Sequence, residues 1–454
     1  MVSALATRIA EEHAAAASSL PAEVVSRERR RHAIETLAAE GLPTTRDENW
    51  KYANLRPLEK VRFAPAQTAT GLKAGDLPEA IQGYARYTFV DGVFVPGLSA
   101  SVARKGISVQ SLREHPPVPT HIRSREAPTR LIEPSKSKDA RFALLNDAFA
   151  TDGAFIRVSE GTDWSRGSGD VPGGDCPTCI ELVFVATVES QAGASYPRVD
   201  LQVDARARVG LIERHVSVGS GANFVNASVR VDIGRGAIVN HYRVQEAGAK
   251  ATWFDTLSAT LAPDAVYKLH GVNVGGLSTR STLNVQLAGE RAEAVISVAS
   301  LGDRHQVQDT FIVVDHIAPH ARSEQIFRGI SAGRARVTCN SMVAVRKDAK
   351  GTDSQQSLRG LLAGPEAEID VRPQLEIYTD DVRCAHGATA GKLDDNMLFY
   401  LLSRGIDAAT AQRLLKWAFL EDVVARIEVP ELRRQIERSL AGQMHEADAL
   451  KELL

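Results

Sequence analysis

The feature that most constrains the fold is a long succession of strand-like runs between residues 154 and 380. The runs follow one another with glycine-containing turns between them, and no helical period interrupts them. In one run, Val229 and Val231 alternate with Arg230 and Asp232, a pattern typical of a strand with one buried and one solvent-exposed face. Regularly spaced strands of this kind predict a sandwich, a barrel or a solenoid.

A second run, from 337 to 345, alternates in the same way. Its pattern places Cys339 on the apolar face and Thr338, Asn340 and Ala344 on the solvent-exposed face. A cysteine at such a position usually behaves as a small buried hydrophobic residue. We therefore expect Cys339 to be structural.

Composition favours the solenoid among the three β architectures. Aromatic residues make up only 6% of the 454 residues, whereas the chain contains 34 glycines. The core must then be built from small aliphatic and β-branched side chains, which suit rungs that stack on one another. No internal repeat is sharp enough to decide the architecture from the residues alone.

Helical or mixed regions are predicted on either side of this core. Residues 1–60 show loose helical spacing of apolar residues, and Pro21 is expected to begin a second helix there. Residues 61–153 are predicted to mix short strands, loops and a short helix near Phe142. The β core is expected over 154–380.

Residues 381–454 are predicted to form a C-terminal helical region. Asp394 and Asp407 are expected to cap two helices, and Pro430 to begin a third. The first two carry broad apolar stripes, which either pack on the body of the protein or form a docking surface for a partner. Both interpretations stay open at this point.

Charge and cysteine content exclude several classes of protein. The net charge is -2, so there is no electrostatic footprint for nucleic acid. Four cysteines in a chain of this length are too few for a disulfide framework and favour a reducing compartment. No apolar run is long enough to span a bilayer, and Glu11 and Glu12 do not fit a secretory signal. We expect a cytoplasmic protein that binds neither nucleic acid nor membrane.

Two motifs resemble catalytic signatures but fail on their details. The G-x-S-x-G pattern at 329–333 needs a helix after it, whereas the following residues alternate like a strand. The stretch 387–392 has three residues between its glycines instead of four, and Leu393 stands where a phosphate loop needs Ser or Thr. We therefore expect neither serine-hydrolase chemistry nor nucleotide hydrolysis by this chain.

Two alternative functions are carried by weaker features. Cys176 and Cys179 form a single CxxC pair, which suits a redox dithiol or half of a zinc site. His316 and His320 have a zinc spacing for a helix, but Pro319 between them argues against a helix.

A β-helix hydrolase or lyase acting on a polysaccharide is the other alternative, although it would need a groove of carboxylates and aromatic rings that no motif here indicates.

Cys384 and His386 are the most suggestive pair for ligand binding. Side chains two positions apart in an extended segment point to the same side. A thiolate and an imidazole on one side can bind iron or another transition metal. A structural cysteine beside a hydrogen-bonded histidine is the alternative, and the residue pattern alone leaves both possible.

The region from 366 to 427, together with several earlier motifs, resembles the SufB/SufD family of iron–sulfur cluster assembly proteins. The stretch from Cys384 to Thr389 resembles the SufD branch of that family. The matching pieces are 368–377, 380–389, 398–401, 403–406, Asp47 to Tyr52, Asp309-Thr310 with His316 and His320, and Asp353 with Gln356.

The resemblance implies a right-handed parallel β-helix core flanked by helical regions. It implies a scaffold rather than an enzyme, which pairs with a SufB-type subunit through the β-helix ends and could form a homodimer when alone. It also implies that the C-terminal helices bind a SufC-type ATPase, and we assign that contact to Phe399, Tyr400, Leu414 and Phe419.

The resemblance also assigns a site for the cluster at the interface with the SufB-type subunit. His386 matches a family histidine that helps cluster formation and is the expected metal ligand. Cys384 lies two residues before it, at a position where family members vary. No cofactor is expected to be held stably; the iron–sulfur cluster would be transient and shared with the SufB-type subunit.

Overall fold

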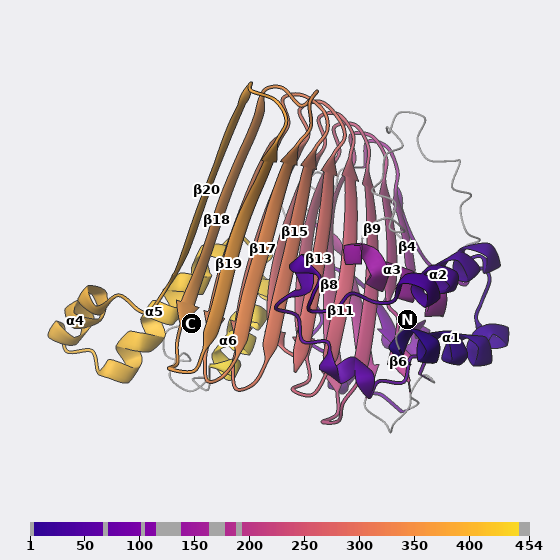
Figure 1. Cartoon of the computed structure of the whole chain (residues 1–454), viewed down its shortest axis with the longest axis horizontal. Helices are drawn as coiled ribbons and strands as arrows, with labels where there is room; N and C mark the ends of the chain where they lie inside the picture. The colour runs from indigo at the N-terminus through magenta and orange to yellow at the C-terminus, as the bar shows by residue number, and fades with distance from the viewer. Residues whose placement is uncertain are drawn as a thin grey trace.

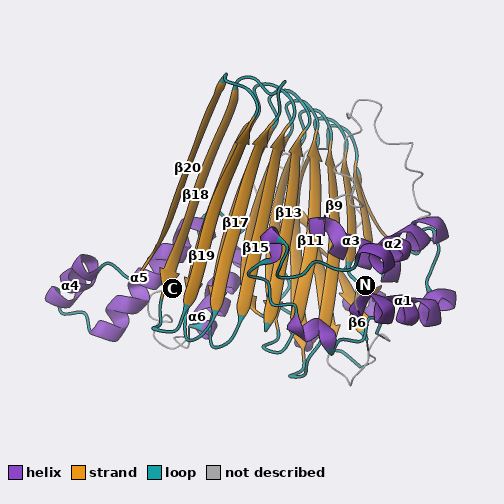
Figure 2. Cartoon of the chain, in the orientation of Figure 1, coloured by secondary structure: helices purple, strands orange, loops and turns teal. Residues whose placement is uncertain are grey.

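The central part of the chain is a parallel β-helix in which successive strands alternate between two facing sheets (Figure 1). The computed structural model describes residues 4–66, 71–100, 105–114, 138–162, 178–187 and 193–444. The expected β-helix with helical regions on either side is thereby confirmed. Figure 2 shows the helices gathered around the base of the strands and at the two ends.

Each sheet is a continuous ladder, parallel except at its N-terminal edge. The first sheet contains, in order, β2 (Val93–Phe94), β1 (Ala85–Val90), β5 (Thr178–Thr187), β8 (Arg208–Val218), β10 (Ile238–Ala247), β12 (Val266–Gly275), β14 (Glu293–Gly302), β16 (Arg322–Ser331), β18 (Thr352–Leu362) and β20 (Val382–Gly391). The second contains β3 (Ile107–Ser111), β4 (Ala154–Val158), β7 (Arg198–Val203), β9 (Phe224–Ile233), β11 (Thr252–Leu261), β13 (Ser278–Leu287), β15 (Val307–His316), β17 (Arg336–Val345) and β19 (Glu368–Ile377), with β6 (Ala194–Ser195) beside β9.

The helices lie outside the β-helix. They are α1 (Ala4–Ala16), α2 (Arg27–Glu40), α3 (Arg141–Phe149), α4 (Asp395–Ser403), α5 (Ala408–Val424) and α6 (Pro430–Gln443), with short 3-10 turns at Ala17–Ser19, Glu48–Trp50, Arg56–Glu59, Ala74–Asp76, Pro96–Leu98 and Lys138–Ala140. Among the described residues, none of these helices combines the length and apolarity that crossing a bilayer requires.

The sheets extend beyond the expected core range of 154–380 at both ends. β1 lies within 61–153, and β20 lies within the region expected to be helical from 381 onward. β20 was hard to recognise because its second half is Gly387-Ala388-Thr389-Ala390-Gly391, which has no apolar alternation. Its pairing with β18 makes it a strand.

The inner faces of the two sheets form one apolar core. Val229 and Val231 are buried there, and the alternating Asp232 on the outer face is exposed, as their spacing predicts. Cys339 is also buried, at 1% exposure, in agreement with its expected structural role. Core side chains of this size keep the facing sheets close along the whole solenoid.

The prediction of a solvent-exposed outer face was wrong for β17. Thr338, Asn340 and Ala344 are all buried. An N-terminal segment crosses the outer face of the second sheet, where Asn340 Nδ2 donates to Asn49 Oδ1 at 3.2 Å. The Arg280 guanidinium lies 4.3 Å from the centre of the Trp50 ring on the same face. The alternation of residues within a strand does not indicate whether a distant segment of the chain covers its outer face.

The second N-terminal helix does not begin at Pro21. Helix α2 starts at Arg27 after Ser26, whose Oγ accepts a hydrogen bond from the Arg29 backbone N–H at 3.3 Å. The Pro21 carbonyl instead accepts from Arg30 Nη2 at 2.8 Å. The helix begins after Ser26 because the serine hydroxyl accepts a hydrogen bond from a backbone N–H that has no partner within the helix.

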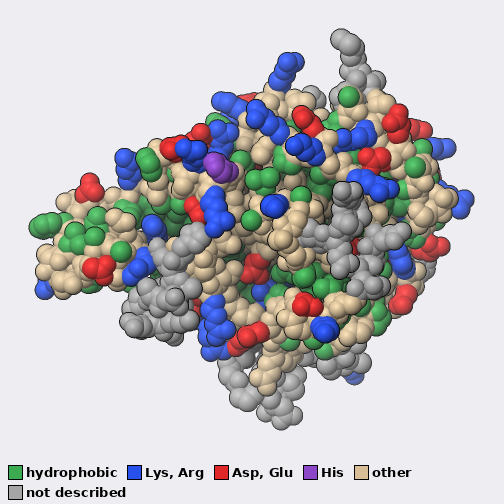
Figure 3. All heavy atoms as spheres, turned by 90° about the horizontal axis from the view of Figure 1, so that it is seen from below, with side chains coloured by type: hydrophobic (Ala, Val, Ile, Leu, Met, Phe, Trp, Pro, Cys, Tyr) green, Lys and Arg blue, Asp and Glu red, His purple; other side chains and the backbone are tan. Residues whose placement is uncertain are grey.

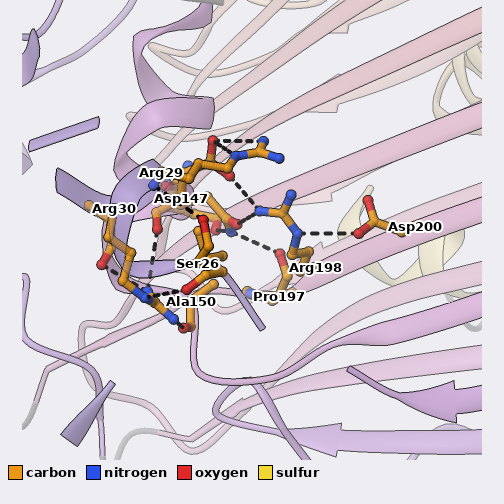
Figure 4. A network of polar contacts seen from close by, with 12 residues as sticks. Ser26, Arg29, Arg30, Asp147, Ala150, Pro197, Arg198 and Asp200 are labelled. Carbon is orange, nitrogen blue, oxygen red and sulfur yellow. Dashed lines mark hydrogen bonds and ion pairs between the residues drawn. The ribbon is translucent and has the colours of Figure 1, made fainter. Parts of the chain in front are cut away.

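Asp147 joins the N-terminal helices to the second sheet (Figure 4). Its carboxylate accepts from Arg29 Nε at 2.8 Å and from Arg198 Nη1 at 2.6 Å. Burial alone would raise the pKa of this carboxyl, but the two guanidinium groups outweigh it and lower the pKa to about 2. The N-terminal region is thus held to β7 by an ionised, buried aspartate.

Candidate functional site at the open end of the solenoid

The C-terminal end of the β-helix is open. β20 is the last strand of the first sheet and β19 the last strand of the second, so each has a neighbour on one side only. Most residues of both strands are exposed or half-buried, unlike those of the preceding strands. An edge of this kind presents unpaired N–H and C=O groups that can pair with another chain.

The apolar core reaches the surface at this end. Five inward-facing side chains of the last two strands pack on the buried core yet remain partly exposed; they are Ile369, Val371, Leu375, Val382 and Cys384. An additional rung would bury them as earlier rungs bury their counterparts. The end therefore has both the hydrogen-bonding edge and the hydrophobic face of an interface.

Cys384 is a free, half-buried thiol on the inner face of β20. Burial raises its pKa, and the nearby negative charge of Asp353 raises it further, while a backbone hydrogen bond from Ser354 opposes them. The thiol is thus protonated in isolation. It becomes a ligand only where a metal ion displaces its proton.

His386 shares the inner side of β20 with Cys384, since the two are separated by one residue. The imidazole is exposed because no further strand covers it. Its register partner on β18 is Gln356, which is buried and donates through Nε2 to the Ser341 carbonyl and Oγ, both at 3.0 Å. The expected common orientation of the pair follows from this strand geometry, while their role as ligands stays a prediction.

No set of three or more His, Cys, Asp and Glu side chains in the part of the chain that the structure describes could hold a metal ion. Cys176 lies outside the described residues, and Cys179 is placed only through the backbone of β5. His316 is buried with Nε2 2.8 Å from Ser323 Oγ, and His320 is exposed in a turn with φ +59°. These two histidines do not face one site.

Helix α4 leaves an apolar surface beside the open end. None of its residues is buried, and Phe399 and Tyr400 are 72% and 56% exposed. Met397 and Leu402 are exposed as well, so the stripe of this helix does not pack on the body. Figure 3 shows hydrophobic side chains gathered on the projecting end of the molecule that carries α4.

The other two predicted contact residues lie on α5 and are only half-exposed. Leu414 is half-buried, and Phe419 packs partly against the cluster that joins α5 and α6 to the first sheet. Asp394 and Asp407 cap α4 and α5, and α6 begins at Pro430, as predicted. Ile377 and Tyr378, at the end of β19, are also exposed, and the spacing of apolar residues in the sequence did not predict this.

The two rejected catalytic motifs are parts of strands. Gly329, Ile330 and Ser331 belong to β16, and the chain then turns into β17 instead of a helix. Residues 387–391 belong to β20, so their backbone does not form a phosphate loop. Neither segment therefore has the local structure that its catalytic signature requires.

The fold and its open end define a β-solenoid protein with helical attachments and an uncapped end. Two family models match the chain: "SUF system FeS cluster assembly, SufBD core domain" over residues 184–419 and "SufBD protein N-terminal region" over residues 9–167. The chain therefore belongs to the SufBD family, whose role is iron–sulfur cluster assembly in the SUF system.

Curated relatives agree with this assignment. The iron–sulfur cluster assembly protein SufD of Escherichia coli is 27% identical over 403 residues, which are 89% of this chain and 89% of that protein. A SufBD family protein of Synechocystis is 26% identical over 426 residues, or 91% and 90% of the two chains. The chloroplastic protein ABCI7 of Arabidopsis thaliana is 29% identical over 254 residues, or 55% and 53%.

Proposed function

We propose that this chain is a non-enzymatic scaffold subunit of a SUF complex in the cytoplasm, which pairs with a SufB-type subunit and binds a SufC-type ATPase. The observation that carries the proposal is the open end of the solenoid, where core and strand edges are exposed together. Similarity to SufD supports it, since that protein is named for cluster assembly.

A homologous solenoid is the partner that fits this end. Two parallel β-helices of one family have the same spacing between their sheets, so β19 and β20 can each continue into a strand of the partner. Ile369, Val371 and Leu375 would then lie inside a continuous core. A second copy of this chain has the same geometry, so a homodimer is expected when the SufB-type subunit is absent.

The iron–sulfur cluster would bind at this interface only transiently. Cys384 and His386 offer one sulfur and one nitrogen on the inner side of β20, and the partner would contribute the remaining ligands. A cluster held by few ligands from each chain can leave again, which suits an assembly site. His386 is the stronger candidate because its imidazole is exposed, whereas the Cys384 thiol must first lose its proton.

Helix α4 provides the surface for the ATPase. Phe399 and Tyr400 form an exposed aromatic pair, and such residues are frequent energetic centres of protein interfaces. Because β20 leads into α4 through only a short connection, movement of a bound ATPase would act directly on the strand that carries His386.

Co-expression with a SufB-type subunit and a SufC-type ATPase tests the proposal. Affinity purification of the tagged chain should recover both partners in a stable complex. Absence of a stable association with the ATPase would contradict the scaffold role. The alternative zinc function is tested by the metal content of the Cys176→Ser variant, which should be lower than that of the wild type if Cys176 holds zinc.

A further inference from the structure

The free edges of β19 and β20 do not offer the same hydrogen-bonding groups to an added strand. In a parallel ladder, the backbone groups of successive residues point alternately to the two sides of the strand. The Glu368 N–H donates to the Ala335 carbonyl at 2.9 Å, and the Tyr378 N–H donates to the Val345 carbonyl at 3.0 Å. The register between β17 and β19 is unbroken. Even-numbered residues of β19 therefore bond to β17, and odd-numbered residues face the open edge.

Pro373 interrupts the free edge of β19. It lies near the middle of the strand at an odd-numbered position, so its nitrogen faces the open edge. A proline nitrogen carries no hydrogen, and the ladder to β17 is complete only because this position does not donate to it. An added strand would find N–H donors at Val371 and Leu375 but none between them. One carbonyl of that strand would be left without a donor.

The free edge of β20 has no such gap. The Asp353 N–H donates to the Ala321 carbonyl at 3.1 Å, so odd-numbered residues of β18 bond to β16 and even-numbered ones to β20. In each register pair of a parallel ladder, only one residue points to the other strand. The even-numbered residues of β20 therefore face the open edge, and each of them has an N–H. The complete row of donors lies on the strand that carries His386.

An uninterrupted pair of edges would be a hazard for this chain. Both strands contain ten residues, and the core side chains beside them are partly exposed. Such an edge pairs readily with another extended segment, and a second copy of the chain is always present. A proline in an edge strand is one means by which natural proteins weaken this pairing. Pro373 is the only proline in the two strands.

We propose that Pro373 limits pairing of the open end with a second copy of this chain and so keeps that end available for the SufB-type subunit. The proposal rests on the proposed role of the open end as an interface. Two copies whose ends stack strand on strand bring two such prolines into the junction. A pair with another subunit contains Pro373 only once. The proline therefore weakens self-association twice and pairing with the partner once.

The missing donor matters because the junction is apolar. Ile369, Val371 and Leu375 pack on the core beside Pro373, and an added rung would cover them. The carbonyl opposite Pro373 would then lose its water and gain no hydrogen bond in return. One buried carbonyl without a donor weakens an association about tenfold, so the two in a homodimer weaken it about a hundredfold.

Pro373→Val tests this role in the full-length chain, because it restores the N–H and keeps an apolar side chain of similar size. The dissociation constant of the homodimer, measured by analytical ultracentrifugation, should fall about a hundredfold. The dissociation constant for the SufB-type subunit should fall only about tenfold. Pro373→Ala restores the same N–H with a smaller side chain and should change both constants in the same direction.

Pro319→Val is the matched control. Pro319 lies in the turn between β15 and β16, so this variant loses a proline without changing a free edge. Both dissociation constants should equal those of the wild type. Hydrogen exchange provides the direct readout of backbone pairing, since β19 of Pro373→Val should gain more protected amides on dimerisation than β19 of the wild type.

Two results would overturn the proposal. One is an unchanged homodimer constant in both Pro373 variants, and the other is equal tightening of the homodimer and of the pair with the SufB-type subunit. Failure of the wild type to bind the SufB-type subunit at all would contradict the proposed function instead. The homodimer constants would still decide the role of Pro373 in that case.

Discussion

Gln356 and His386 are register partners on β18 and β20, so the exposed imidazole lies one strand spacing from a buried amide. That amide is fixed across the core by two hydrogen bonds to Ser341. The histidine thus extends from a rigid surface and contributes nothing to the buried core. Replacing its side chain should therefore leave the fold undisturbed.

Replacing His386 by Ala should lower cluster formation by the purified complex about tenfold while leaving the complex assembled, since the loss of a ligand or its support typically has this effect. Stability of the isolated chain should change by less than about 0.5 kcal/mol, because the side chain is exposed. Iron and sulfide content is the measurement. Thr389→Ala, exposed on the outer side of the same strand, is the control, and equal cluster content in both variants would remove His386 from the site.

A lysine at Ala388 should prevent pairing with the SufB-type subunit. Ala388 lies on the inner side of β20 but is exposed at the open end, so the charge is solvated in the monomer and buried only when a partner stacks there. Size-exclusion chromatography of co-expressed chains measures the effect. Ala385→Lys, on the outer side of β20, should pair normally. Pairing of both variants would mean that the open end is not the interface.

Phe399→Glu should weaken binding of the SufC-type ATPase by about 2 kcal/mol or more, as expected for an exposed aromatic residue at an interface centre. The binding constant can be measured by calorimetry with the purified ATPase. Asn396→Glu adds the same charge to an exposed position of α4 and should have little effect. If the two variants bound equally well, the aromatic surface of α4 would not be the contact.

The stability of the chain should fall as the pH is lowered from about 6.5 to about 4. Burial lowers the pKa of His316 to about 4. The unfolded chain takes up a proton near 6.5, so it binds more protons than the folded chain in this window, and unfolding is favoured there by up to about 3 kcal/mol.

Urea unfolding at pH 7 and pH 5 measures this dependence. His316→Gln should lose less stability between the two values than the wild type, whereas His320→Asn, at an exposed turn position, should behave like the wild type. An equal loss in the His316 variant would contradict the assignment. His270, whose pKa burial also lowers to about 4, keeps part of the dependence in every variant.

The starts of the three C-terminal helices could be predicted from the sequence, whereas the start of α2 was placed wrongly and the burial of a strand by a distant segment could not be predicted. Asp394, Asp407 and Pro430 begin their helices as expected because capping depends on neighbouring residues alone. The burial of Asn340 depends on Asn49, which is distant in sequence. No periodicity within β17 could indicate that contact.

The sequence pattern also did not predict the buried polar cluster of Glu213, His215, His241, Arg243 and Asp255. In β8, the inward positions change from apolar Leu211 to charged Glu213 and then His215, so alternation alone assigns the second half of the strand to solvent. Only the strand register brings Arg243 beside Glu213 and reveals that the charge is paired inside the core. The pairing of Cys384 and His386 on one side was predictable because it depends on two neighbouring positions of one strand.

The central claim is tested most directly by the iron and acid-labile sulfide bound to the complex of SufB-type and SufC-type subunits, purified with and without this chain. The scaffold account predicts that cluster content falls several-fold when the chain is left out and returns when it is added back. Equal iron and sulfide in the two preparations would contradict it.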